Sequence, residues 1–201
     1  VCNGILRSLI REKDNIAMPD PEVNPVRALS VKYSVPEWLV EKVIKDYGME
    51  HAKNMFDSLY ENVGATSIRV NTSKISTEEC VKLLEKEGVH VEKGAYVENA
   101  LEISGYDSLG FLETFEKGYF QVQDVSSMLV GLAAAPKAGE FVIDICAAPG
   151  GKSCTAAQYA RNGKVVSCDL YPSRVQLIED NFRRLGIDNA TATQNNALVF
   201  N

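Results

Sequence analysis

Residues 140–196 alternate between short apolar segments and helical segments, and this order restricts the possible folds more than any other feature of the sequence. Continuous apolar runs at 140–146 and 164–170 are each followed by a segment with helical periodicity, and a third extended run covers 190–196. Apolar runs without alternation are typical of strands in a sheet that is covered on both faces. Strand–helix–strand–helix–strand is one half of a doubly wound parallel sheet, so the pattern predicts an α/β fold for this part.

The residues that precede this pattern predict two smaller parts. Residues 1–30 have the periodicity of one helix followed by a proline-containing linker. Residues 31–117 combine helices with a β-α-β-β run at about 66–104, which predicts a small α+β subdomain similar to an RNA-binding (RRM-like) sheet. Trp38 lies in the first of these helices and is expected to be a core anchor. Residues 118–201 form the third part, so the expected boundaries are 1–30, 31–117 and 118–201.

Composition narrows the classes of protein to which the chain can belong. The formal net charge is −6, from 21 Lys and Arg against 27 Asp and Glu, which counts against nonspecific binding of nucleic acid but permits a local basic patch. The five cysteines form no CxxC pair and the two histidines lie far from them, so we expect no metal site and reduced thiols. No run approaches the roughly 20 apolar residues of a membrane span. We expect a cytoplasmic monomer without a membrane partner.

The loop after the first parallel strand, DICAAPGGKSC at 144–154, carries the strongest functional signal. A phosphate-binding GxxxxGK[ST] loop would need glycine where this chain has Cys146. In that interpretation Lys152 would contact phosphates and Ser153 would hold Mg²⁺. Pro149 counts against it, because proline removes a backbone N–H from a nest built of such donors. The competing interpretation is a loop for a nucleoside ligand with less phosphate character.

Polar residues at the ends of the next two strands favour the nucleoside interpretation. The second strand ends at Asp169, 18 residues after Gly151, and an acid at this position accepts hydrogen bonds from ribose hydroxyls. The third strand ends at Asn195 and Asn196, where an adenine edge would lie. Because the carboxyl ends of parallel strands meet at one edge of a sheet, these residues predict one adenosine-shaped site. A helix-capping role for Asp169 stays open on this spacing alone.

The same stretch resembles a known family. DICAAPGGKS (144–153) resembles the S-adenosylmethionine loop of the Nop/Sun family of RNA cytosine-5 methyltransferases, and GYFQVQDVSSMLV (118–130) resembles the segment that precedes this loop. VCNGILRSLIRE (1–12) resembles the end of the NusB-like helical domain in the bacterial Sun branch. The resemblance covers nearly the whole chain. It implies the first half of a Rossmann-like S-adenosylmethionine-dependent methyltransferase sheet, preceded by a helical and small α+β (RRM-like) portion.

What the resemblance implies for the cofactor can be assigned residue by residue. Asp169 would accept hydrogen bonds from the ribose hydroxyls, and position 196 would lie beside the adenine. The family usually has Asp there, whereas Asn196 offers an uncharged carbonyl acceptor, so we expect weakened cofactor binding. The loop that would wrap the methionine and ribose portions consists of Cys146, Ala147, Ala148, Pro149, Gly150, Gly151 and Lys152.

The resemblance also implies a catalytic group that this chain does not contain. In the family a cysteine thiolate adds to C6 of the flipped cytosine and a second cysteine assists product release, and both follow the fourth and fifth strands. The chain stops at Asn201, just past the third strand, and none of its five cysteines matches either position. We therefore expect the nucleophilic cysteine beyond residue 201, an inactive fragment, and a chain truncated at both ends.

The partner that the resemblance implies is 16S ribosomal RNA of the small subunit. Basic residues of the N-terminal portion are the expected RNA contacts, although each has the alternative role of a solvated surface charge. These residues are Arg7, Arg11, Lys13, Lys32 and Arg69. Two other functions stay open, namely a P-loop NTPase and a non-catalytic RNA-binding or assembly module that keeps the cofactor fold.

Overall fold

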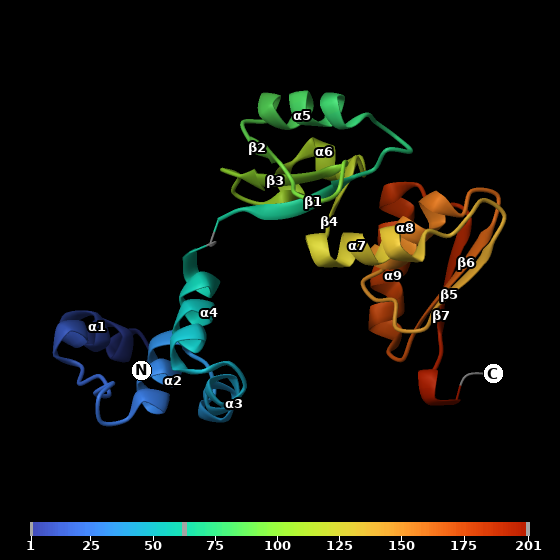
Figure 1. Cartoon of the computed structure of the whole chain (residues 1–201). Helices are drawn as coiled ribbons and strands as arrows, with labels where there is room; N and C mark the ends of the chain where they lie inside the picture. The colour runs from blue at the N-terminus through green and yellow to red at the C-terminus, as the bar shows by residue number, and fades with distance from the viewer. Residues whose placement is uncertain (1, 62–63, 200–201) are drawn as a thin grey trace. The chain divides into compact units, whose positions relative to one another are not determined.

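The computed structural model describes residues 2–61 and 64–199, which belong to two compact units, residues 1–63 and 64–201. The first unit is helical, and the second contains two β-sheets with their helices (Figure 1). Val1, at the start of the predicted first helix, lies outside the described residues. Across the described ranges, no helix combines the length and the apolar character that crossing a membrane requires.

The helical unit consists of four α-helices and a short 3₁₀ turn, and a side chain caps the second α-helix. Asn24 caps the second of them, because its side chain accepts a hydrogen bond from the backbone N–H of Arg27. Pro25 occupies the first turn of the same helix, where a missing N–H costs nothing. The elements are α1 (Cys2–Glu12), a 3₁₀ turn (Lys13–Asn15), α2 (Pro25–Tyr33), α3 (Glu37–Tyr47) and α4 (Met49–Glu61).

Two predictions for this unit are wrong. The linker predicted at the end of residues 1–30 stops early, because α2 already begins at Pro25. Trp38 is not a core anchor, since it is 65% exposed. Val40 and Val43 of the same helix are buried, and the 3.6-residue period puts Trp38 on the opposite face of α3. The core of the unit consists of Leu29, Tyr33, Val40, Val43, Ala52 and Phe56.

The second unit begins with a four-stranded antiparallel sheet in the order β2-β3-β1-β4. Its chain order is β-α-β-β-α-β, so a fourth strand completes the predicted β-α-β-β run. The elements are β1 (Thr66–Val70), α5 (Thr77–Lys86), β2 (His90–Lys93), β3 (Ala100–Ser104), a 3₁₀ turn (Leu109–Phe111), α6 (Glu113–Glu116) and β4 (Phe120–Val122). The predicted boundary between 31–117 and 118–201 assigns β4 to the other sheet, whereas β4 pairs with β1.

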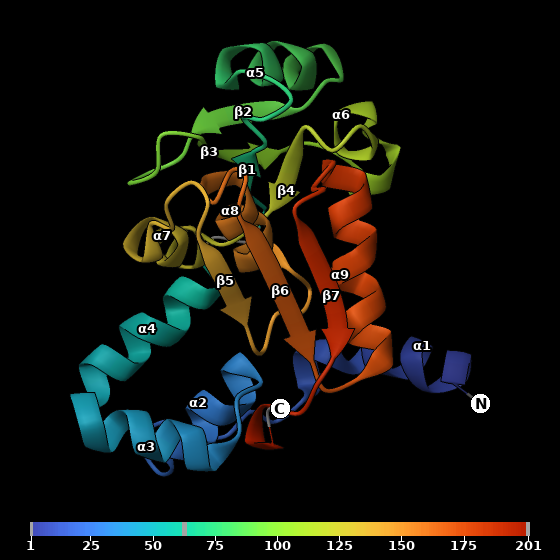
Figure 2. The same cartoon turned by 90° about the vertical axis from the view of Figure 1, so that its right-hand side faces the viewer.

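The two faces of this antiparallel sheet differ in polarity. Ile68 and Val70 of β1 lie in an apolar core with Leu84 of α5. The alternate residue of β1, Arg69, is paired in register with Gln121 of β4, and both are buried polar residues. Because successive side chains of a strand point to opposite faces, the sheet has an apolar face toward α5 and a polar face on the other side. Figure 2 shows α5 above this sheet and α8 below it.

The second sheet of this unit is parallel and confirms the predicted α/β fold. Its order is β5-β6-β7, with each crossover made by a helix. Phe141 and Ile143 of β5 are 61% and 45% exposed, so the expectation that β5 is covered on both faces is wrong for the described residues. The elements are α7 (Val125–Ala134), β5 (Phe141–Asp144), α8 (Gly151–Tyr159), β6 (Lys164–Asp169), α9 (Pro172–Leu185), β7 (Ala190–Gln194) and a 3₁₀ turn (Ala197–Val199).

Buried polar contacts fasten the antiparallel sheet to α9. The Asn71 side-chain amide, 2% exposed, donates to the backbone oxygens of Leu185 at 2.9 Å and of Gly118 at 3.0 Å. Arg184 of α9 donates to the backbone oxygen of Phe120 at 2.9 Å. Gly118 has a left-handed backbone with φ of 68°. A Cβ at that position would lie 1.9 Å from the Arg184 backbone oxygen, so the junction requires glycine there.

Candidate cofactor site

The loop 145–150 follows β5 and is tied to the helix after it by Asp144. One carboxylate oxygen of Asp144 accepts from the backbone N–H of Cys146 at 3.3 Å, and the other accepts from the Ser153 hydroxyl at 2.8 Å. Both ends of the loop are therefore held by the last residue of the strand. The sequence analysis missed Asp144, although an acid at the end of the first parallel strand was a visible signal.

Gly150 and its neighbours shape the turn into α8. Gly150 has φ of 101°, which L side chains rarely adopt, and its backbone N–H donates to the Ala147 oxygen at 2.6 Å. The Asn181 side chain of α9 donates to the Pro149 oxygen at 2.9 Å. The first-turn N–H groups of α8 have no preceding helical turn to accept them, so this helix start favours electron-rich ligand atoms.

Asp169 lies at the end of β6 and contacts the loop directly. It is 6% exposed, and one carboxylate oxygen accepts from the Ala148 N–H at 3.2 Å. The other oxygen pairs with Arg174 Nε at 3.2 Å, and Arg174 also donates to the Ala148 backbone oxygen at 3.2 Å. A carboxylate has about four acceptor positions, so Asp169 can still accept from a ligand. The sequence analysis missed Arg174, whose signal was a basic residue in the first turn after Asp169.

The end of β7 lies beside Asp169 and forms a shallow hollow. The Asn195 backbone N–H donates to the Asp169 backbone oxygen at 3.0 Å. The Asn196 side-chain oxygen accepts from the Leu198 backbone N–H at 3.0 Å, so its best acceptor is partly engaged. The hollow has a volume of about 330 Å³ and is lined by Leu170, Gln194, Asn195, Asn196 and Val199.

The structure brings the loop, Asp169 and Asn196 to one edge of the parallel sheet, as the strand order predicts. The Lys152 side chain does not join these residues, because its ammonium donates to the Ser127 hydroxyl of α7 at 3.3 Å. Ser153 is 1% exposed and donates to Asp144, so it is not free to hold Mg²⁺. These donors and acceptors fit a nucleoside with few phosphates better than a nucleoside triphosphate.

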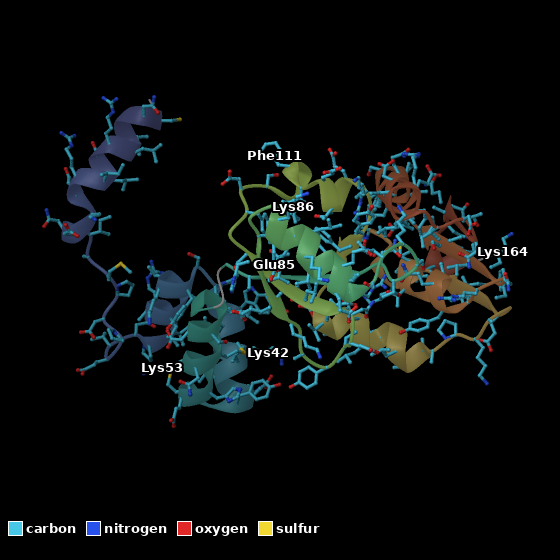
Figure 3. All side chains as sticks on the ribbon, turned by 90° about the horizontal axis from the view of Figure 1, so that it is seen from above. Lys42, Lys53, Glu85, Lys86, Phe111 and Lys164 are labelled. Carbon is cyan, nitrogen blue, oxygen red and sulfur yellow. The ribbon has the colours of Figure 1, made fainter. Side chains whose placement is uncertain are left out.

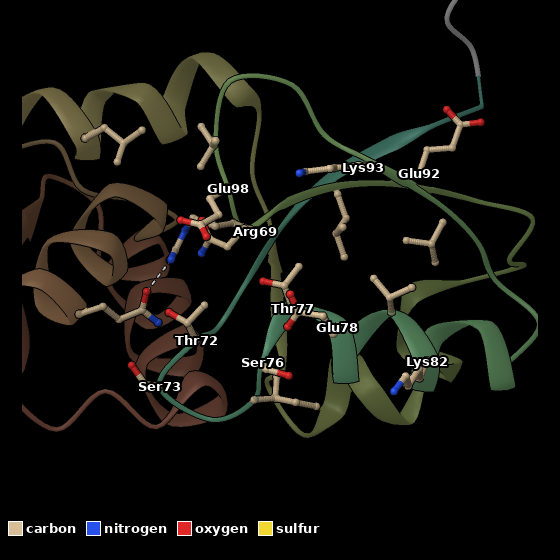
Figure 4. A pocket seen from close by; sticks show the side chains of 18 of the residues that line it. Arg69, Thr72, Ser73, Ser76, Thr77, Glu78, Lys82, Glu92, Lys93 and Glu98 are labelled. Carbon is tan, nitrogen blue, oxygen red and sulfur yellow. Dashed lines mark hydrogen bonds between the residues drawn. The ribbon is translucent and has the colours of Figure 1, made fainter.

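A larger cavity of about 1220 Å³ is lined by residues of α5, of strands β1 to β3, and of α7 and α8 (Figure 4). Its wall carries several hydroxyls, and its charges balance. The cations are Arg69, Lys82, Lys93 and Arg161, and the carboxylates are Glu78, Glu85, Glu92 and Glu98. A groove that neutralises phosphates needs an excess of cations, so this cavity is not assigned to the RNA backbone.

The basic residues predicted to contact RNA divide into two groups. Arg7, Arg11, Lys13 and Lys32 are exposed, and cationic side chains such as Lys42 and Lys164 also project from their elements (Figure 3). Arg69 is only 4% exposed and bonds to other side chains. The prediction that Arg69 contacts RNA is therefore wrong, because β1 turns its side chain into the polar face of the sheet.

Comparison with known proteins identifies the family. Residues 35–107 match the ferredoxin-like domain of RsmF/B-like methyltransferases, and residues 131–200 match the 16S rRNA methyltransferase RsmB/F family. The two matches together span more than half of the chain. The first runs from α3 to β3 of the antiparallel sheet, and the second runs from the end of α7 through the parallel sheet. The chain belongs to the RsmB/F family. This assignment disfavours the P-loop NTPase alternative, in agreement with the engaged Ser153 hydroxyl.

Curated relatives of this RsmB/F chain act on ribosomal RNA according to their names. A probable ribosomal RNA small subunit methyltransferase B of Bacillus subtilis (strain 168) is 39% identical over 186 residues, which is 92% of this chain and 41% of the relative. Ribosomal RNA small subunit methyltransferase B of Escherichia coli O1:K1 is 29% identical over 190 residues, again 92% and 41% of the two chains. The chain thus spans about two fifths of the length of these relatives.

Solved structures share the fold of the RsmB/F chain. The crystal structure of PH0851 is 33% identical with a TM-score of 0.79, and the match covers 88% of this chain and 40% of that one. The structure of NSun6 from Pyrococcus horikoshii with SFG is 25% identical with a TM-score of 0.74, and the match covers 81% of this chain and 66% of that one. The Rossmann-like parallel sheet and the ferredoxin-like antiparallel sheet are therefore family features.

Thiol chemistry gives a first prediction for the loop. Burial raises the pKa of Cys80 to about 11 and of Cys154 to about 12, and it also raises the pKa of Cys168. Cys2 and Cys146 are exposed. We expect an aromatic disulfide reagent at pH 8 to modify Cys2 and Cys146 rapidly and the three buried thiols only on unfolding, as counted by absorbance.

S-Adenosylhomocysteine should protect one of the two rapid thiols, because Cys146 lies in the loop and Cys2 lies in the other unit. The variant Cys146→Ser is the control, since it should lose only the protected fraction of the rapid phase. Equal labelling rates with and without S-adenosylhomocysteine would contradict a ligand at the loop.

Asn196 provides a second prediction. In Asn196→Asp, one carboxylate oxygen can keep the Leu198 N–H while the other accepts from an adenine amine, so affinity for S-adenosylhomocysteine should rise about fivefold. Titration calorimetry measures the change. Asn162→Asp is the matched control, because it adds the same charge at an exposed position before the amino end of β6, and it should leave the affinity within twofold. A loss of affinity in Asn196→Asp would exclude an adenine amine at this position.

Proposed function

We propose that this RsmB/F chain binds S-adenosylmethionine at the loop 146–152, and that the whole protein methylates C5 of a cytosine in 16S ribosomal RNA. The observation that carries the cofactor assignment is the position of Asp169, a buried carboxylate that contacts the glycine loop. The next residue, Leu170, lines the hollow, and the Asp169 backbone oxygen accepts from the Asn195 N–H at the end of β7. SFG, the S-adenosylmethionine analogue named with the NSun6 structure, and the names of the curated relatives support the same proposal.

Each part of the site has one role in this proposal. Asp169 accepts hydrogen bonds from the two ribose hydroxyls, and Asn196 lies beside the adenine. Residues Cys146–Lys152 surround the methionine and ribose portions, with Gly150 and Gly151 permitting close approach of the backbone. S-Adenosylmethionine, when bound, supplies an electrophilic methyl group on a sulfonium centre.

The assignment of cytosine C5 rests on the resemblance of the loop to RNA cytosine-5 methyltransferases. We propose that the thiolate that adds to the base lies outside residues 1–201. Buried Cys154 and Cys168 have raised pKa values, which suits inert thiols rather than nucleophiles. Cys146 belongs to the cofactor loop in this proposal. Ribosomal RNA is the proposed partner, with the exposed cations of the helical unit as contacts.

Calorimetric titration of the chain with S-adenosylhomocysteine, with ATP and Mg²⁺ as a parallel titrant, tests the proposal. We expect saturable binding of S-adenosylhomocysteine at one site and no binding of ATP and Mg²⁺. Binding of ATP and Mg²⁺ alone would restore the phosphate-loop interpretation. A folded chain, by circular dichroism, that binds neither compound would favour a non-catalytic RNA-binding or assembly module.

A further inference from the structure

Helix α8, which begins at the proposed cofactor loop, lies with one stripe of residues against the polar face of the antiparallel sheet. The stripe consists of Gly151, Cys154 and Gln158, whose i, i+3 and i+7 spacing puts them on one side of a helix. A Cβ at Gly151 would lie 3.2 Å from the Gln121 amide nitrogen of β4. At the other end of the stripe, the Gln158 oxygen accepts a hydrogen bond from Arg69. The antiparallel sheet therefore contacts α8 near both ends of the helix.

Arg69 joins three elements at this contact. From β1 it donates through Nε to the Gln123 side-chain oxygen, just after β4, at 2.9 Å, and through Nη1 to the Gln158 oxygen of α8. Gln158 in turn donates to the Asn71 side-chain oxygen at 2.6 Å. A guanidinium reaches two acceptors at once with a fixed geometry, which a flexible ammonium does not. One planar group thus joins α8 to β1 and to the residue that follows β4, two strands that the backbone ladder already pairs.

The hydrogen-bond acceptors of the charged Arg69 guanidinium are uncharged side-chain amides. Burial lowers its pKa, and among the described residues no carboxylate lies within 4.0 Å of the guanidinium. Nearby, Gln121 Oε1 and Gln123 Nε2 are buried without a partner in the described part of the chain. A partly satisfied polar network is costly unless its remaining bonds are kept. The contact therefore depends on the two Arg69 hydrogen bonds more than on apolar packing.

We infer that Arg69 is a positioning residue for the cofactor loop, which it orients by holding the Gln158 end of α8 against the antiparallel sheet. The inference rests on the proposed function, since it concerns the same S-adenosylmethionine site. Removal of the Arg69 guanidinium leaves the Gln158 end of α8 free to tilt. The tilt moves Gly151 and the loop tied to it by the Ser153–Asp144 hydrogen bond. Cofactor affinity then falls although no atom of Arg69 touches the loop.

Calorimetry with S-adenosylhomocysteine on single and double variants tests this role. Arg69→Met and Gln158→Met should each weaken binding about tenfold, and the double variant should be no weaker than the worse single one, because both remove the same contact. Leu84→Ala is the control for stability. Leu84 is buried on the apolar face of the same sheet, so its loss should lower Tm without changing affinity by more than twofold.

Exchange of backbone hydrogens on the unaltered chain provides a readout that does not depend on the folding of a variant. Because coupling between sites is reciprocal, S-adenosylhomocysteine should slow exchange in β1 and at Gln123 as well as in the loop. Unchanged exchange in β1 overturns the inference, and so does an Arg69→Met variant that loses stability like Leu84→Ala but keeps its affinity. Failure of the unaltered chain to bind S-adenosylhomocysteine overturns the proposed function itself.

Discussion

Asp169→Ala should weaken binding of S-adenosylhomocysteine at least about 100-fold, which is the largest effect on binding that the site predicts. The substitution removes a carboxylate that accepts from both ribose hydroxyls in the proposed function. It also removes the acceptor of the Ala148 N–H and the counter-ion of Arg174. The loop therefore loses the hydrogen bond that ties it to the end of β6. Hydrogen bonds to charged groups are about twice as strong as neutral ones, which makes this single residue decisive.

Two matched variants separate the effect of Asp169 from those of charge and packing. Asp180→Ala removes an exposed carboxylate of α9 that pairs with Arg183, and it should leave affinity within twofold. Asp169→Asn keeps one oxygen for the Ala148 N–H, so it should retain stability yet lose most of the affinity. Asp169→Ala binding within threefold of the unaltered chain would show that the ribose hydroxyls lie elsewhere.

Gly118→Ala should lower the stability of the second unit by about 3 kcal/mol, or about 10 °C in Tm. Gly118 has φ of 68°, and its Cβ would lie 1.9 Å from the Arg184 backbone oxygen and 3.0 Å from the Lys74 ammonium. A clash with backbone cannot be relieved by a rotamer change. The segment before β4 or the end of α9 must therefore move, which breaks the hydrogen bonds from Asn71 and Arg184.

Gly139→Ala is the control for backbone strain. Gly139 also has a positive φ, 84°, but no atom lies within 4 Å of its Cβ position. The Gly139→Ala variant should therefore lower the free energy of unfolding only by the strain of a left-handed backbone, about 1 kcal/mol. Thermal unfolding followed by circular dichroism measures both variants. Equal losses of stability in the two variants would mean that backbone strain, and not close contact with α9, explains the glycine at 118.

Local sequence signals predicted most elements of the second unit. Continuous apolar runs identified β5 and β6, whose boundaries the structure confirms within a few residues, and the helical periodicity after the second run identified α9. Strand β4 was missed because Phe120–Val122 has three residues and its partner β1 lies some 50 residues earlier. A strand of three residues is too short to show hydrophobic alternation, so only its pairing with another strand identifies it.

The candidate site was predictable where the chemistry is local. The loop and Asp169 follow from spacing and from the rule that ligands bind beyond the carboxyl ends of parallel strands. Arg69 was misread as a surface cation and Trp38 as a core residue, because burial depends on what packs against a strand or helix and not on residue type alone. Arg69 is the clearer case, since a single Arg in an alternating strand predicts exposure unless a second element supplies acceptors.

The late position of β4 in the chain has a consequence for how the protein is made. A ribosome releases residues from the N-terminus onward, and units fold as they emerge. Strands β1, β2 and β3 leave the tunnel before Phe120–Val122, so β1 waits with one unpaired edge until β4 arrives. Residues 124–140 then separate β4 from β5. Any shortened chain for expression should therefore end before Thr66 or after Gln123, because a cut between them leaves β1 without β4 and exposes its hydrogen-bonding edge to other chains.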